Sequence, residues 1–402
     1  MKCSNLRLSF QVGALALVSL FLLSRPTNVA AQSSDQQRTT ARPAIGAGST
    51  LVHSKFGGQI FGFDIDQNGT EGVLSEDKLL SNGNVLAAIE TFDQKTGKIL
   101  KVVSETENQD NFLTLGIEGT SVGLVEQEIS QGLFVTERIY DVLNPLDSNK
   151  LTGTWTPPLT KDDLIVGISR NQASTTSAVL VISDGGIGST FVFGSNVGAN
   201  TFEAPVTLSD PVFGIGDGPQ VAYDSTTNQA VVAASTGEVG GPPPVFALVN
   251  LTSATVTEFN GLPGPPPFRE GFVNGLAVDW EDGIACTTTE VDFRVEFYNL
   301  QTEIGASEVL PGASSQIQSG SDVEFDPVHK LFFVAQSVSS TAPGSSIQVY
   351  DTSGKLVESL NGFNFSNASN VVFTHIALNP SNRTGYVDGP DSGVTEIQSF
   401  TY

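Results

Sequence analysis

Cysteine is almost missing from this chain. Of its two cysteines, Cys3 lies in an N-terminal apolar segment and only Cys286 lies in the body, so no internal disulfide is expected. Cys286 alternates with apolar residues in the stretch GIACTTTEV, which predicts a buried, unreactive thiol. The chain is long enough to bury a substantial core without disulfides.

Basic residues are also scarce. The chain has 19 Lys and Arg against 43 Asp and Glu, a formal net charge of −24. Nucleic acids and anionic membranes are recognised through basic patches, so this balance argues against both as partners. It favours a cation or a basic partner, or simply solubility outside the cell.

Long apolar runs are limited to residues 12–23, which are too short to cross a bilayer. Lys2 and Arg7 precede this run, and the small residues Val29-Ala30-Ala31 follow it, which is the pattern of a cleaved signal peptide. We therefore expect a signal peptide at 1–31, a flexible polar leader at 32–49 and one domain at 50–402. The protein should be secreted or periplasmic, without a membrane span.

Sustained helical periodicity is missing, and so are the motifs G-x-S-x-G, H-E-x-x-H and the phosphate-binding glycine loop. Short alternating segments fill the chain instead. Residues 322–362 contain three of them, DVEF, KLFFVAQS and SIQVYD, and a turn at Asp351-Thr-Ser-Gly354 leads into a fourth, KLVESLNG. This stretch predicts one four-stranded antiparallel unit.

The same register recurs along the chain, with a turn-starting residue at the end of each first strand. These residues are Asp64, Glu118, Arg170, Asp224, Asp279, Asp326 and Asn379. A repeat of about 50 residues in an all-strand chain is typical of a β-propeller. The sequence therefore predicts an all-β, seven-bladed β-propeller with four-stranded antiparallel blades. Asp224, Asp279, Asp326 and Asn379 are expected to cap their own turns.

The last unit contains only three strands, HIALN, TGYVDG and VTEIQSFTY. An isolated strand at Thr50–Ser54 (TLVHS) precedes the first unit. We expect this N-terminal strand to pair with the C-terminal blade and close the ring, because closure removes an exposed sheet edge. The chain should be a monomer.

The stretches GLAVDWEDGIACTT and VYDTSGK resemble the NHL, YVTN and SMP-30-like group of propellers. The resemblance covers mainly the fourth to sixth units and implies the propeller fold. The group includes lactonases, other hydrolases, sugar and peptide binders and scaffolds, so it does not select an activity. No catalytic motif of the group can be matched here.

Asp64, Asp66 and Asn68, followed by Gly69, resemble a D-x-D-x-[DN]-G loop, in which alternate oxygens bind Ca²⁺. The later acidic ligand of such loops is out of place in this chain. A calcium site and a simple Asx turn therefore remain alternative interpretations.

Histidine is scarce, and His329 is expected to be solvated in its turn.

The residue four positions before each turn-starting residue should lie near one mouth of the central channel; these residues are Ile60, Thr114, Val166, Gln220, Gly275, Asp322 and His375. Asp322 and His375 would lie in adjacent blades. They could form a catalytic acid–base pair, act as metal ligands, or only satisfy each other's hydrogen bonds. Gln220, Asn274 and Arg269 are the candidate ligand-binding residues beside them.

Loops between second and third strands, and between blades, should emerge on the face where the first strands begin, which we call the top face. The long loops 240–244, 263–269 and 339–346 fall there, and ligands are commonly held in loops on rigid scaffolds. The first hypothesis is a binding module for a small molecule or protein. Alternatives are a lactonase-type hydrolase with Asp322 and His375 at the channel mouth, and a matrix interaction protein.

Overall fold

The computed structural model divides the chain into two compact units, Met1–Arg42 and Pro43–Tyr402. The residues that it describes all belong to the second unit: 47–65, 70–108, 112–118, 123–131, 134–143, 163–170, 177–184, 189–196, 201–214, 219–236, 242–263, 273–289, 294–311, 318–338, 346–363, 375–389 and 396–402. The predicted signal peptide lies outside the described residues, as does most of the predicted leader.

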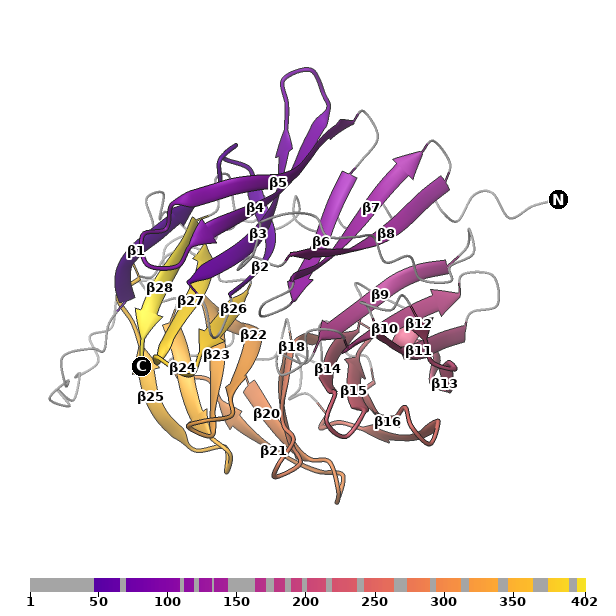
Figure 1. Cartoon of the computed structure of the whole chain (residues 1–402). Coiled ribbons are helices and arrows are strands. Elements are labelled where there is room, and N and C mark those ends of the chain that lie inside the picture. Colours follow the sequence, from indigo (N-terminus) through magenta and orange to yellow (C-terminus); the bar gives the residue numbers. More distant parts are fainter. Residues whose placement is uncertain are drawn as a thin grey trace, which may run out of the picture. The chain divides into compact units, whose positions relative to one another are not determined.

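The described residues form seven antiparallel sheets, which we call blades one to seven (Figure 1). Blade one contains β2 (Gln59–Ile65), β3 (Glu71–Leu79), β4 (Val85–Asp93) and β5 (Ile99–Asn108). Blade two contains β6 (Phe112–Glu118), β7 (Gly123–Gln131) and β8 (Phe134–Leu143). Blade three contains β9 (Asp163–Arg170), β10 (Ser177–Asp184), β11 (Ser189–Asn196) and two short strands that both pair with β11, β12 (Thr201–Phe202) and β13 (Val206–Leu208).

The C-terminal blades are more regular. Blade four contains β14 (Gln220–Asp224), β15 (Gln229–Ala234), β16 (Val245–Asn250) and β17 (Thr255–Asn260). Blade five contains β18 (Val273–Asp279), β19 (Ile284–Thr289), β20 (Arg294–Asn299) and β21 (Ile304–Val309). Blade six contains β22 (Gln318–Asp326), β23 (Leu331–Val338), β24 (Ser346–Asp351) and β25 (Leu356–Leu360). Blade seven contains β26 (Ile376–Asn379), β27 (Thr384–Gly389), β28 (Glu396–Thr401) and β1 (Ala47–His53).

The first strands of successive blades contact one another in the order β2, β6, β9, β14, β18, β22 and β26, and β26 contacts β2 again. The predicted all-β propeller is confirmed. Helical structure in the described residues is limited to one 3₁₀ turn at Pro211–Gly214. No described helix has the length and hydropathy of a membrane span.

Closure of blade seven follows the predicted arrangement. β1 pairs antiparallel with β28, with His53 opposite Glu396 and Val52 opposite Ile397. The Gln398 amide adds a hydrogen bond from Nε2 to the carbonyl oxygen of Gly48 at 2.9 Å. The closing strand begins at Ala47 instead of Thr50, so the end of the predicted leader belongs to this sheet.

Apolar side chains fill the spaces between neighbouring blades. Separate buried clusters join blades three and four, four and five, five and six, six and seven, and seven and one. The alternation seen in the sequence produces them, because successive residues of a strand point to opposite faces and each face meets a neighbouring blade. Cys286 is fully buried in one of these clusters, as predicted.

The hairpins between first and second strands in blades four to seven share one geometry. The turn-starting residue pairs with the residue five positions later: Asp224 with Gln229, Asp279 with Ile284, Asp326 with Leu331 and Asn379 with Thr384. The carboxylates cap their own turns; Oδ1 of Asp326, for example, accepts a hydrogen bond from the backbone N–H of Val328 at 2.8 Å. The predicted capping role is confirmed for Asp224, Asp279 and Asp326, whereas Oδ1 of Asn379 accepts from the Ser381 hydroxyl at 2.6 Å.

Blade one departs from the predicted register. Asp64 pairs with Val73 inside the ladder between β2 and β3, so it does not start the turn. In blade six, Asp322 pairs with Ala335. The equivalent pair in blade one is Gly62 with Ser75, so Gly62 and not Ile60 occupies the position of Asp322. The predicted register of blade one is therefore two residues too early. The segment Asp64-Ile65-Asp66 offers two acidic residues as turn-starting residue, and periodicity alone does not select between them.

Candidate functional site

Asp322 lies near the start of blade six, where its carboxylate reaches the first strand of blade seven. Oδ2 accepts a hydrogen bond from the backbone N–H of Ile376 at 2.9 Å, and Oδ1 accepts one from Val323 at 2.8 Å. Burial raises the pKa of the Asp322 carboxyl to about 7, against the opposing effects of the His375 charge and of these two hydrogen bonds. Near neutral pH, Asp322 therefore exists in both protonation states.

His375 directly precedes β26 and is held by Asp388 of β27. The imidazole Nδ1 lies 2.8 Å from Oδ2 of Asp388, and the His375 backbone N–H donates to Oδ1 at 2.8 Å. The His375 side chain is 35% exposed, whereas that of Asp388 is fully buried. Burial lowers the pKa of the imidazole, but the charge and hydrogen bond of Asp388, together with the charge of Asp322, raise it overall.

These three residues form a cluster where blades six, seven and one meet. The ring of Phe63 from β2 packs edge-on against the His375 ring, with the centroids 6.4 Å apart. All four carboxylate oxygens of Asp322 and Asp388 accept a hydrogen bond or face the imidazole. The cluster therefore holds the start of β26 in place and leaves Nε2 of His375 as the ring nitrogen available to a ligand.

The sequence predicted that Asp322 and His375 would be neighbours, and the structure brings them together. It did not predict Asp388, which makes the direct contact with His375. The available signal was an acidic residue inside the apolar strand TGYVDG, because a buried carboxylate needs a partner.

The predicted ligand-binding residues are spread over several blades. Gln220 begins β14 in blade four, and Asn274 lies at a register irregularity of β18 in blade five. Gly275 follows it, and a Cβ there would lie 2.6 Å from the backbone nitrogen of Val323, so β18 and β22 approach closely at this point. Arg269 lies outside the described residues.

The predicted calcium loop is only partly described. Asp64 is buried, and its Oδ1 accepts a hydrogen bond from the backbone N–H of Ile65 at 2.7 Å. Asp66 and Asn68 lie outside the described residues. Across the described part of the chain, no group of three His, Cys, Asp or Glu side chains could hold a metal ion.

A second pair of carboxylates lies buried in blade one. Glu76 of β3 accepts hydrogen bonds from the backbone N–H groups of Phe56 and Gly58, at 3.0 and 2.8 Å. Glu90 of β4 accepts one from the Lys55 backbone at 2.8 Å. Burial raises the pKa of Glu90 to about 7, and the neighbouring Glu76 carboxylate contributes to this increase. The pair holds the connection from the closing strand β1 to β2.

His329 is not simply solvated, contrary to the sequence-based expectation. Its Nδ1 lies 2.7 Å from Oδ2 of the buried Asp326 carboxylate, and its ring contacts that of Tyr402 edge-on. The Tyr402 hydroxyl donates to the same Oδ2 at 2.8 Å. His329 therefore helps to fasten the hairpin of blade six to the last residue of blade seven.

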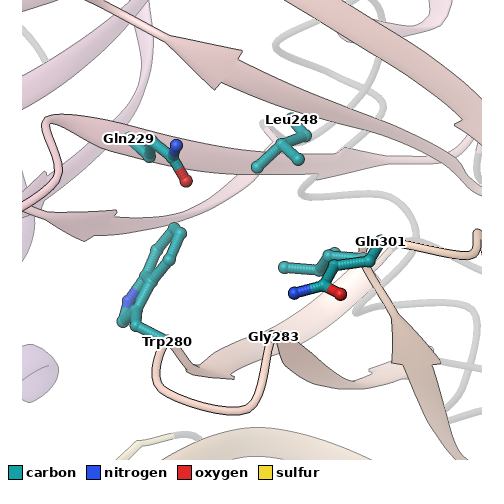
Figure 2. A pocket seen from close by; sticks show the side chains of 6 residues that line it. Gln229, Leu248, Trp280, Gly283 and Gln301 are labelled. Atoms are coloured by element: carbon teal, nitrogen blue, oxygen red, sulfur yellow. The ribbon is translucent and has the colours of Figure 1, made fainter.

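A pocket of about 270 Å³ lies between blades four and five, away from His375 in the fold. Figure 2 shows the Trp280 indole and the side chains of Gln229, Leu248 and Gln301 around it. Trp280 lies between β18 and β19 and Gln301 between β20 and β21 of blade five, and Gln229 and Leu248 belong to β15 and β16 of blade four. The sequence analysis did not single out Trp280 as a binding residue.

Searches against protein-family models and curated protein sequences find no match. Solved structures do match in fold. The RRP9 WD40 repeats superpose with a TM-score of 0.57 at 12% identity, over 89% of this chain and 99% of that chain. The Dos1 propeller gives a TM-score of 0.58 at 8% identity, over 89% and 96%. A chain of hydrazine synthase from Kuenenia stuttgartiensis gives 0.53 at 11% identity, over 88% and 96%.

These similarities support the β-propeller fold. They do not single out the NHL, YVTN and SMP-30-like group that the sequence resembles. Propellers at this level of identity include WD40 repeats and an enzyme, so the fold does not determine the activity. Any function must be argued from the sites themselves.

Proposed function

We propose that this chain is a non-catalytic binding module that recognises a small molecule or a protein through its top face, with His375 as a central contact. The observation that supports this proposal is the division of roles within the cluster. Asp322 and Asp388 hold backbone and imidazole groups, while the His375 ring remains about one-third exposed at the start of β26. A fixed, partly exposed imidazole is a suitable hydrogen-bonding group for a ligand.

Charge supports the same proposal. With a net charge of −24, the chain would attract a basic partner over long range and bind it less well at high salt. We propose a monomeric, exported protein whose signal peptide, residues 1–31, is removed. Mass spectrometry of the secreted or periplasmic protein tests export, because cleavage after Ala31 leaves Gln32 as the first residue.

The binding proposal is tested by affinity capture with purified protein, followed by measurement of the dissociation constant for each purified candidate. His375→Ala should weaken binding at least tenfold, whereas the matched change His53→Ala in the closing strand should leave it unchanged. If a partner binds His375→Ala and His53→Ala with the same affinity, its binding surface does not include His375.

A second candidate is a hydrolase of lactonase type, and one observation favours it. Asp322, whose pKa is raised to about 7, lies beside His375, so a proton acceptor and a proton donor coexist near neutral pH. Purified protein should be assayed with aryl esters and simple lactones, with and without added Ca²⁺ or Zn²⁺. Turnover that disappears in both Asp322→Asn and His375→Ala would establish the hydrolase and refute the non-catalytic proposal.

A further inference from the structure

The pocket between blades four and five has a mixed lining. Six residues form it: Gln229, Leu248, Trp280, Gly283, Leu300 and Gln301. Trp280 is partly exposed and packs against the apolar cluster that joins the two blades, and Leu300 is buried. Figure 2 shows amide groups on two sides of the space, one from Gln229 and one from Gln301, with the indole between the two blades.

The two hairpins of blade five that contribute to the pocket are fixed by their own hydrogen bonds. Oδ1 of Asp279 accepts from the backbone N–H of Glu281 at 3.2 Å, and Oδ1 of Asn299 accepts from Gln301 at 3.0 Å. The backbone N–H of Leu300 donates to the carbonyl oxygen of Gly283 at 2.9 Å and so ties one hairpin to the other. The backbone of the blade-five wall is therefore formed before a ligand binds, which reduces the entropic cost of binding.

Gly283 lines the pocket beside Gln301. Its φ is +66°, a conformation that favours glycine, and a Cβ at this position would lie 3.8 Å from both Cγ and Nε2 of Gln301. A side chain at position 283 would thus occupy space beside the Gln301 amide.

The acidic residues next to Trp280 are engaged elsewhere. Nζ of Lys330, from blade six, lies 2.8 Å from Oδ1 of Asp279 and 2.6 Å from Oε2 of Glu281. This ion pair lies on the blade-six side of the hairpin, whereas the pocket lies on the blade-four side. None of the six lining residues is ionisable, although the chain as a whole is strongly acidic. The pocket is therefore suited to an uncharged ligand.

An amide both donates and accepts hydrogen bonds, as a hydroxyl group does. The face of an indole carries negative charge density and attracts the weakly positive C–H groups of a ring stacked on it. Ligand pockets usually measure roughly 300 to 1,000 Å³, so a volume of about 270 Å³ suits one ring and not an extended molecule. We propose that this pocket binds a neutral sugar ring, stacked on Trp280 and hydrogen-bonded by Gln229 and Gln301.

Intrinsic fluorescence tests this proposal directly, because the chain has only two tryptophans, Trp155 and Trp280. A Trp155→Phe variant of the full mature chain leaves Trp280 as the single reporter. It should be titrated with glucose, galactose, mannose, xylose and N-acetylglucosamine, and binding should be checked by saturation-transfer NMR. At least one sugar should produce a saturable change in fluorescence together with saturation transfer to its ring protons.

Variants then assign the contacts. Trp280→Ala should abolish saturation transfer, and Gln301→Ala should weaken binding about fivefold to tenfold, the loss expected for one hydrogen bond. Gln59→Ala, at an exposed glutamine of blade one, is the matched control and should leave binding unchanged. Circular dichroism spectra and melting curves should show that each variant is folded.

The remaining outcomes contradict the proposal. A panel in which no sugar shows saturable binding would refute it, and so would sugar binding that persists in Trp280→Ala. Saturable binding of N-acetylprolinamide without any sugar would show that the pocket holds a peptide ring instead. If sugar binding is lost in His375→Ala but not in Trp280→Ala, the sugar binds at the top face and not in this pocket.

Discussion

Blades four and five meet mainly through aromatic rings, whereas at the boundary of blades six and seven a carboxylate of one blade binds the backbone of the next. In the first interface, the ring of Phe246 from blade four lies 4.5 Å from that of Tyr298 from blade five, between centroids. Phe259, also from blade four, stacks on Phe246 at 5.2 Å. In the second, the Asp322 carboxylate crosses to the Ile376 backbone. The same blade geometry thus tolerates two kinds of contact. Ionisable groups lie beside both, because the Tyr298 hydroxyl donates to the buried Glu296 carboxylate in the first interface. In the second, the carboxyl itself joins the two blades, and its pKa is raised to about 7.

Several buried carboxylates lie near the closure of the ring. Blade seven is assembled from both ends of the domain, since β1 completes the sheet of β26, β27 and β28. Asp322, Asp388, Glu76 and Glu90 all lie in blades six, seven and one, where they hold backbone groups of β26 and of the connection after β1. Buried carboxylates with several hydrogen bonds specify geometry more strictly than apolar contacts do.

The largest effect should come from the aromatic interface. Phe246 is fully buried, so Phe246→Ala should lower the free energy of unfolding by about 3 to 5 kcal/mol, because it removes apolar contacts and leaves a cavity. Urea denaturation at pH 5 and pH 8 should give the same loss. Phe246→Leu is the matched control and should cost less. A loss that differs strongly between the two pH values would remove the distinction between the interfaces.

A smaller loss is expected at the polar junction. Asp388→Ala removes the acceptor for the His375 imidazole and for its backbone N–H, so it should cost about 2 to 4 kcal/mol. Asp282→Ala, at an exposed acidic residue, should change stability by less than about 0.5 kcal/mol. If both variants are equally stable, the cluster does not hold blade seven.

The pH dependence of stability should reflect the raised pKa values. Glu90, with a pKa raised to about 7 by burial, binds a proton more readily in the folded state than in the unfolded state. Protonation of Glu90 therefore contributes to the stability of the folded state. This contribution is complete below the unfolded-state pKa of about 4.5 and is lost as the pH rises through the folded-state pKa of about 7. The pKa of Asp322 is also raised to about 7, and that of His375 is raised as well. Both groups therefore make the folded state less stable as the pH rises.

Stability should therefore fall between pH 5 and pH 8, with Glu90 contributing on the order of 2 kcal/mol. Glu90→Gln keeps the shape without the charge and should flatten this part of the curve. Thermal melting of the unaltered protein and of Glu90→Gln at several pH values between 5 and 8 measures this dependence. A curve for Glu90→Gln that parallels the original would show that Glu90 does not titrate in this window.

The smallest effect concerns calcium, which remains a prediction from the DIDQNG pattern. If calcium binds there, free Ca²⁺ several times above its dissociation constant should stabilise the protein by about 1 kcal/mol. Asp64→Asn should abolish this increase, and a chelator should reproduce the loss in the unaltered protein. An increase that survives in Asp64→Asn would refute this site.

Much of the fold could be predicted because each blade repeats local signals. Asp224, Asp279 and Asp326 end alternating strands and start turns of one length, which made the period visible. Where two acids compete, as at Asp64 and Asp66, local signals gave the wrong register. The extent of β1 also escaped prediction, because Ala47 to Ser49 are polar or small and show no strand pattern of their own. Ala47 pairs with Phe400 of β28, a partner far away in the sequence.

The sites could be predicted only in part. Asp322 and His375 occupy equivalent positions of neighbouring blades, so the repeat alone placed them together. The carboxylates of Asp388, Glu76 and Glu90 were missed because their partners come from other strands or from a loop, which a periodic pattern does not reveal. The pocket at Trp280 depends in the same way on the approach of blade four to blade five.

The most direct test of the account is a pH titration of the histidine signals by NMR. The chain has three histidines, so His375 can be assigned with His375→Asn. We predict that His375 titrates above its ordinary pKa of 6.5 and that Asp388→Asn lowers this value. A His375 that titrates at or below 6.5 and is unaffected by Asp388→Asn would contradict the proposed polar junction between blades six and seven.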